Sequence, residues 1–173
     1  IKSTAQAEGS AIDRALLAEW MKSEDINVLG AVSFIILNDK LFAKITPPLT
    51  IREYQPFLLK YWVHCLVENP TGEWCETREI AGHSLVHWFK RLWLDVNVPK
   101  TIFMDMKKTL ESLYLLESKD VRDAITKTIL EDLFKDAEIQ EFFANWKTDE
   151  GLQAAYIIAD EWAKAHKSQR VVK

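Results

Sequence analysis

Three side chains that could bind a metal ion, Glu79, His83 and His87, follow one another at intervals of four residues. On a helix this spacing places them along one face. His64, on the preceding helical pattern, would add a third imidazole, and such a set suits zinc or iron. The spacing matches neither H-E-x-x-H nor the paired Glu-x-x-His of di-iron bundles. A helical metalloprotein or metalloenzyme is therefore one hypothesis, and a solvated polar face with a Glu–His pair is the other.

The two cysteines, Cys65 and Cys75, both lie within apolar helical patterns. A reactive cysteine needs a partly exposed, electropositive setting, whereas a free cysteine in an apolar setting packs as a small hydrophobe. We therefore predict packing roles, with a disulfide across Pro70 as the less favoured alternative. The sequence shows no Ser-His-Asp order, phosphate-binding glycine loop or zinc-type cysteine spacing. We predict no catalytic residue and no cofactor.

Tryptophans are concentrated between residues 50 and 95, where four of the seven lie. Aromatic residues at helical spacing usually form core, but this number exceeds what one small core needs, and exposed aromatic residues are typical of protein interfaces. On a helical wheel Arg78 points into an apolar arc, so it needs a carboxylate partner. The candidate binding residues are Trp74, Glu76, Arg78, Trp88 and Trp93.

Charge and composition limit the classes of partner. The chain carries 22 Lys and Arg against 26 Asp and Glu, for a net charge of −4. Nucleic-acid binding usually requires a basic surplus or stripe, so we expect no nucleic-acid partner, and a basic protein fits the acidic balance better. No apolar run reaches about 20 residues, so we expect no membrane partner and a cytoplasmic location.

The elements that must position these residues are helices. Apolar residues recur at helical spacing, while Gly and Pro number only 5 each. The run 26–37 is almost wholly apolar, which fits a buried helix or a buried strand; we favour the helix because no second strand is evident to pair with it. The expected helices cover 11–22, 26–37, 51–69, 73–95, 99–117, 119–135, 137–146 and 149–167, with a short turn near 41–45.

Several residues fix the expected helix ends. Ser10 and Ser23 suit N-caps, and Thr50 with Glu53 has the spacing of a capping box. Pro56 falls early in the 51–69 pattern, so either its first turn is kinked off or the regular helix begins near Pro56. Further along the chain, Pro99, Ser118, Asp136 and Thr148 are placed to begin helices.

Gly82 lies within the apolar arc of the 73–95 pattern, where it costs about 1 kcal/mol relative to Ala. A neighbouring helix could therefore approach closely at this point. We expect one all-α domain over 10–167, with a flexible leader at 1–9 and a basic tail at 168–173. It would hold about seven or eight helices, mostly antiparallel neighbours around a central hairpin at 50–95.

The stretch PFLLKYWVHCLVENPTGEWCETREIAGHSLVHWFKRLW resembles a pattern in a family of small bacterial all-helical proteins. In that pattern a Pro-x-Gly-Glu-Trp turn precedes a helix with Arg, then Ala-Gly, then Val-x-Trp-Phe. The segment 129–149 resembles the same group. The resemblance implies a helical fold and no established activity. His83 and His87 do not belong to the pattern, which weakens the metal hypothesis.

The leading functional prediction is a non-enzymatic protein-binding module, such as an immunity or inhibitor protein that neutralises its partner. The metal-binding set His64, Glu79, His83 and His87 is the first alternative. A helical-repeat-like scaffold is the second, because the helical pairs at 99–135 and 136–167 loosely suggest stacked repeats.

Overall fold

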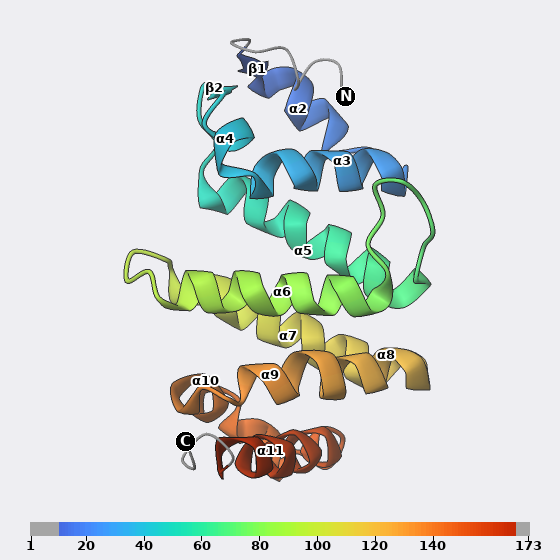
Figure 1. The fold of residues 1–173 in the computed structure, drawn as a ribbon, viewed down its shortest axis with the longest axis vertical. Coiled ribbons are helices and arrows are strands. Elements are labelled where there is room, and N and C mark those ends of the chain that lie inside the picture. The colour runs from blue at the N-terminus through green and yellow to red at the C-terminus, as the bar shows by residue number, and fades with distance from the viewer. Residues whose placement is uncertain (1–10, 169–173) are drawn as a thin grey trace. The chain divides into compact units, whose positions relative to one another are not determined.

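The fold is all-α, as predicted (Figure 1). The computed structural model describes residues 11–168, of which 73% are helical. The predicted leader 1–9, the predicted cap Ser10 and all but the first residue of the predicted tail lie outside the described residues. No helix within 11–168 is long and apolar enough to cross a membrane.

The chain forms two compact units that divide between Thr77 and Arg78. Unit 1 ends with the segment that follows its last helix, and unit 2 begins with the next helix. The helices expected to pair as a hairpin at 50–95 thus belong to different units. The hairpin and the single domain over 10–167 stay predictions.

Unit 1 is built around one buried helix, α3, which packs against α2, α4 and α5 (Figure 1). The predicted helix at 11–22 is shorter in the structure, because Ile12 and Asp13 pair in parallel with Ile45 and Thr46. The elements are β1 (Ile12–Asp13), α2 (Arg14–Trp20), α3 (Ile26–Leu37), α4 (Asp39–Phe42), β2 (Ile45–Thr46) and α5 (Ile51–Glu68).

Helix α3 confirms the helical interpretation of 26–37. Its N-cap is Asp25 rather than Ser23, and the Asp25 carboxylate accepts a hydrogen bond from the backbone N–H of Asn27. The Ser23 hydroxyl instead accepts from the N–H of Asp25, two residues too early to cap the helix. An aspartate cap also places a negative charge at the positive end of the helix dipole.

Helix α5 begins with the predicted capping box, in which Glu53 accepts a hydrogen bond from the backbone N–H of Thr50 at 2.8 Å. The expectation of a kinked or delayed start at Pro56 is wrong, because the helix runs unbroken from Ile51 with Pro56 inside it. Pro56 removes only one helical hydrogen bond, to the carbonyl of Arg52. Near the N-terminus the capping box holds the first turn in place.

Unit 2 contains the remaining helices, with the π-helical segment η1 between α6 and α11 (Figure 1). Helices α8 and α9 extend η1 on either side, so the predicted helix 119–135 is present with a π segment inside it. The elements are α6 (Arg78–Trp93), α7 (Lys100–Leu116), α8 (Lys119–Ala124), η1 (Ile125–Leu130), α9 (Glu131–Leu133), α10 (Ala137–Phe142), η2 (Ala144–Thr148, 3-10) and α11 (Gln153–Ser168).

The predicted starts in unit 2 hold for three of the four helices. Pro99 and Ser118 occupy N-cap positions, and the Asp136 side chain accepts from the N–H groups of Glu138 and Ile139. The predicted helix at 149–167 begins later, at Gln153, because the Asp149 carboxylate accepts from the N–H of Gly151 and forms a turn first. The predicted 137–146 helix likewise ends at Phe142 and continues as the 3-10 turn η2.

An aromatic cluster forms the core of unit 2. The Phe89 ring lies at its centre, 5.2 Å from the Phe103 centroid and 5.7 Å from that of Trp93. Phe142 and Phe143 approach from α10 and its C-cap. The offset and edge-on geometries are those that aromatic quadrupoles prefer, so these rings fix how α6, α7 and α10 pack.

Candidate functional site

The segment between α5 and α6, residues 69–77, is called the strap here because it folds back over unit 1. Helix α5 ends at Glu68 and is followed by its C-cap Asn69, whose backbone is left-handed with φ of 49°. The predicted helix 73–95 starts only at Arg78. The strap residues 73–77 are not helical, because side chains of unit 1 hold their backbone groups.

The side chain that holds the strap is Tyr61 of α5. Its hydroxyl donates to the carbonyl of Trp74 and accepts from the N–H of Glu76, each at 3.1 Å. We call these two bonds the Tyr61 clasp. Tyr61 is 1% exposed, and burial, followed by the nearby Cys65 and Glu76, raises the pKa of its phenol. The phenol therefore stays protonated and keeps its donor across the physiological pH range.

The strap packs directly against helix α3. Gly30 faces the strap so closely that a Cβ there would lie 1.8 Å from the Trp74 carbonyl oxygen. Near the start of the helix, Asn27 Oδ1 lies 3.5 Å from Cys75 Sγ. A Cβ at Gly72 would lie 2.4 Å from that same oxygen. Gly30 thus lets the backbones of α3 and the strap meet directly, and Gly72 leaves room in the strap for the Asn27 side chain.

Where the strap crosses α3, two aromatic rings meet at the surface of unit 1. Phe34 and Trp74 pack edge to face, with centroids 5.6 Å apart. Phe34 is 49% exposed although it is a large apolar side chain, and Trp74 is half-buried. The Tyr61 clasp holds the backbone carbonyl of Trp74. We call this pair of rings the Phe34–Trp74 surface.

The segments that carry these two rings also carry exposed acidic residues. Asp25 and Glu73 are exposed. Burial, and then the charge of Asp25, raises the pKa of the Cys75 thiol. Burial raises the pKa of Cys65 to about 11. Both cysteines are free thiols that stay protonated at neutral pH, which does not favour nucleophilic chemistry.

The other candidate binding residues lie on α6 in unit 2. Arg78 has the predicted carboxylate partner, since its Nη1 lies 3.7 Å from Asp120 Oδ2. Trp88 is 6% exposed, and the guanidinium carbon of Arg91 lies 5.5 Å from its ring centroid. Trp93 is half-buried and packs edge-on against Phe103 at 5.0 Å. The two tryptophans therefore contribute to the packing of unit 2, and their role in binding stays a prediction.

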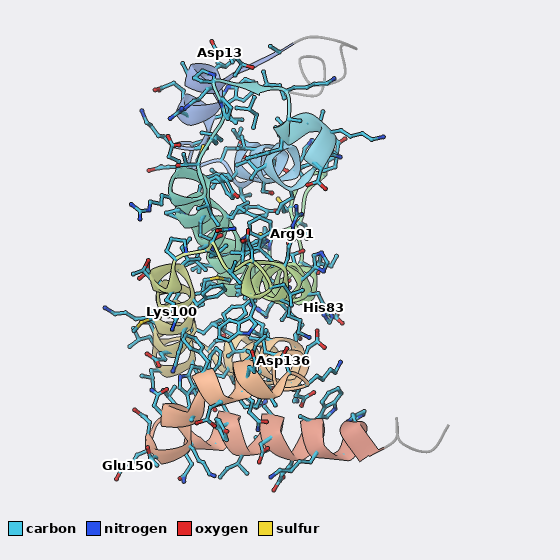
Figure 2. The ribbon with its side chains drawn as sticks, turned by 90° about the vertical axis from the view of Figure 1, so that its left-hand side faces the viewer. Asp13, His83, Arg91, Lys100, Asp136 and Glu150 are labelled. Carbon is cyan, nitrogen blue, oxygen red and sulfur yellow. The ribbon has the colours of Figure 1, made fainter. Side chains whose placement is uncertain are left out.

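The histidines of the metal hypothesis have separate settings. His64 lies on α5, with its Nε2 3.0 Å from Glu68 Oε1. Glu79, His83 and His87 are exposed along α6, and Figure 2 labels His83 on that helix. Among the described residues no group of three or more His, Cys, Asp or Glu side chains is placed to hold a metal ion. The metal set therefore has no geometric support in this part of the chain.

Of the candidate residues, the structure brings Trp74 and Glu76 together, because both are bonded to Tyr61. Arg78, Trp88 and Trp93 share α6. Sequence reasoning missed Phe34, because in a run that is apolar all round no residue stands out as exposed. Gly30, one turn before it, was the available signal, since a glycine inside a buried helix often marks the close approach of another backbone.

The chain was compared with known proteins. It matches no protein-family model, no curated protein and no solved structure. The resemblance to small bacterial helical proteins therefore stays an expectation, and the function has to be argued from the residues themselves.

Proposed function

We propose that this protein is a non-enzymatic protein-binding module that uses the Phe34–Trp74 surface. The observation that carries the proposal is the exposure of Phe34, 49%, beside a tryptophan whose backbone is fixed. Rigid, partly exposed aromatic residues are the usual anchors of protein interfaces. They lose little conformational entropy on binding, because their position is already set in the free protein.

Charge favours a basic partner. Exposed acids lie on both segments that carry the rings, Asp25 at the N-cap of α3 and Glu73 directly before Trp74, and the whole chain carries a net charge of −4. Opposite charges at the rim of an interface accelerate association and exclude partners of like charge. A partner that places an apolar or aromatic side chain on Phe34, within a basic surface, fits both features.

The form of binding that we propose is that of an immunity or inhibitor protein, which binds another protein in the cytoplasm and neutralises it. Such a protein needs a preformed surface and no chemistry of its own. The raised pKa values of the Cys65 and Cys75 thiols support this, because these thiols are poor nucleophiles. The Tyr61 clasp supports it too, because it holds the backbone from which the Trp74 ring projects.

The test is affinity purification of the tagged full-length protein from its own host, followed by binding measurements with the partner recovered. Phe34→Ala should weaken binding about tenfold or more, as expected for an interface anchor. Asp25→Asn should mainly slow association and reduce its dependence on salt.

The matched control is Ile158→Ala, since Ile158 of α11 is 48% exposed but lies in unit 2. This variant should bind as the parent does. Recovery of no stable partner would refute the proposal. Equal weakening by Phe34→Ala and Ile158→Ala would show that the binding surface lies elsewhere or is non-specific.

A further inference from the structure

The outer side of helix α11 in unit 2 is apolar at its centre although it faces solvent. Ile157 and Ile158 are 43% and 48% exposed, and Ala154 is exposed one turn before them. These residues fall at i, i+3 and i+4, which places them on one face of the helix. The solvent side of a surface helix is usually polar or charged. Exposed apolar residues that gather in this way indicate a contact surface. The inner side of the helix is lined by the buried residues Leu152, Ala155, Tyr156, Ala159 and Ala163.

The C-terminal end of α7 widens this apolar face. A Cβ added at Gly151 would lie 2.6 Å from Cδ2 of Leu115, so the leucine packs against the turn that precedes α11. Leu115 is itself 51% exposed. Gly151, Ala154 and Ile158 follow one another at intervals of three and four residues, so Leu115 adjoins the same side of the helix. We call Leu115, Ala154, Ile157 and Ile158 the α11 face.

Charges of opposite sign lie at the two ends of the α11 face. Glu150 is exposed at the end where the chain enters the helix (Figure 2). The N–H of Gln153 donates to the carbonyl of Asp149 at 2.8 Å, which is the four-residue spacing of the helix. Glu150 therefore lies nearly in phase with Ile157, about two turns later. Lys164 lies two further turns along the same side, and its side chain is 72% exposed.

We propose that the α11 face forms a homodimer, in which α11 of two copies packs antiparallel about a two-fold axis at Ile157. A two-fold contact uses the same surface in both copies, so each residue must suit the one opposite it. Around this axis Glu150 lies opposite Lys164 of the second copy, and the pair occurs twice. The apolar centres cover each other, and the acidic end of each helix meets the basic end of the other.

The other residues of the helix suit this arrangement. Ala154 has a small side chain, which lets two helices approach to about 8–10 Å between their axes. Glu161 falls opposite Gln153 of the second copy, so no acid faces an acid. Asp160 lies at the edge of the face, where its carboxylate is already bonded to Gln140 and to Lys164 of its own chain.

A second copy fits better than an unrelated protein, because the face supplies its own complement by symmetry. An unrelated partner would need an apolar stripe with charges in the reverse order. The dimer uses none of the residues of the Phe34–Trp74 surface. It therefore goes beyond the proposed function and can be tested separately from it.

The test is sedimentation equilibrium of the full-length protein from about micromolar to about millimolar concentration. We expect the average mass to rise from that of one chain, 20.0 kDa, to twice this value, with a dissociation constant in the micromolar range. The mass of one chain at every concentration would overturn the proposal. Growth beyond two chains would overturn it as well, because a two-fold contact closes with the second copy.

Ile157→Glu tests the centre of the contact. It should raise the dissociation constant about a hundredfold, because two glutamates would meet at the axis. The matched control is Met104→Glu, which adds the same charge at a residue of α7 that is 61% exposed and about three turns from Leu115. The control should dimerise as the parent does. Equal dissociation constants for the two variants would place the contact elsewhere and overturn the assignment.

Charge reversal tests the antiparallel arrangement, and it also covers the case in which circular dichroism shows that Ile157→Glu disturbs the helix. Glu150→Lys or Lys164→Glu alone places like charges opposite each other and should weaken the dimer about tenfold. Both changes in one chain restore opposite charges across the axis, and the affinity should return to within about threefold of the parent.

An equimolar mixture of the two single variants provides the decisive control. One variant then has lysine at both ends of the face and the other has glutamate at both ends, so a dimer of one copy of each again pairs opposite charges. The mixture should dimerise more tightly than either variant alone. A mixture no tighter than its components, or additive weakening in the double variant, would overturn the antiparallel dimer.

Discussion

Gly30 of unit 1 and Gly82 of unit 2 both lie on buried helix faces, but the atoms opposite them differ. A Cβ at Gly30 would lie 1.8 Å from a backbone oxygen, that of Trp74. A Cβ at Gly82 would lie 2.9 Å from Cγ2 of Thr128, a side-chain methyl of η1. Gly30 lets the backbones of α3 and the strap come into contact. Gly82 lets the Thr128 side chain pack directly on the backbone of α6.

The difference shows how each unit is held together. In unit 1 an irregular segment is fastened through backbone groups, by the Tyr61 hydroxyl and by direct contact with α3. In unit 2 regular helices pack through side chains, mainly the rings around Phe89. Contacts through backbone tolerate less change, because a backbone cannot rotate away as a side chain can.

Gly30→Ala should have the largest effect. Alanine improves helix propensity by about 1 kcal/mol, but the overlap with the Trp74 carbonyl must be relieved by moving the strap or α3. We expect a net loss of about 1–3 kcal/mol in the free energy of unfolding, with faster exchange of strap amides. Denaturant unfolding followed by circular dichroism, together with hydrogen exchange, measures both.

The control for this change is Gly151→Ala, where the added Cβ would meet the end of a flexible side chain, Cδ2 of Leu115 at 2.6 Å. Because that leucine is 51% exposed, it can turn away, and the effect should stay within about 0.5 kcal/mol. Equal losses in the free energy of unfolding for Gly30→Ala and Gly151→Ala would show that contacts with backbone atoms are no less tolerant of change than contacts with side chains.

Gly82→Ala should have an intermediate effect, and a second substitution should relieve it. Thr128→Ser removes the methyl that the new Cβ would meet and keeps the hydroxyl. Alone, Gly82→Ala should lose about 1 kcal/mol or less, because the gain in helix propensity partly offsets the overlap. Combined with Thr128→Ser it should be less destabilising than the sum of the two single changes, which a double-mutant cycle measures. Additive effects would show that the two side chains do not limit each other.

The helices of both units could largely be predicted from sequence, because their signals are local. Examples are the apolar periodicity of α7 (100–116), the Thr50–Glu53 capping box and the Asp136 cap. The elements that were predicted wrongly are those whose structure depends on contacts with residues distant in sequence. Residues 73–77 follow helical periodicity but are bonded to Tyr61 instead. The pairing of β1 with β2 involves two residues in each strand, too few for an alternating pattern to appear.

Prediction of the candidate site was less complete. The Arg78–Asp120 ion pair and the close approach at Gly82 follow from a charge and a glycine set within an apolar arc, and the structure contains both. Phe34 and Tyr61 gave no such signal. A buried tyrosine looks the same in sequence whether its hydroxyl bonds to the backbone of a strap or to a neighbouring side chain, and only the fold decides.

Substitution of Asp132 in unit 2 should have the smallest effect on the free energy of unfolding. Its pH dependence shows whether Asp132 stabilises the unit through its charge or through its packing. It lies 2.6 Å from Lys135 Nζ and 3.3 Å from Lys90 Nζ. Burial raises the pKa of its carboxyl, but the bonds and charges of these two lysines outweigh burial and hold the pKa below its usual range. A carboxyl with a depressed folded pKa stabilises the protein above its unfolded pKa of about 3.9. That contribution is lost as the pH falls through the folded pKa.

Asp132→Asn should therefore lower the free energy of unfolding by a few tenths to about 1 kcal/mol at pH 7, since its side chain is 32% exposed and partly screened. The difference from the parent should shrink below about pH 4 and disappear as the pH falls through the lowered pKa of the folded state. Unfolding curves at several pH values measure it. A difference that stays constant down to pH 2 would mean that Asp132 acts through packing, and side-chain shape rather than charge would then account for its part in holding unit 2 together.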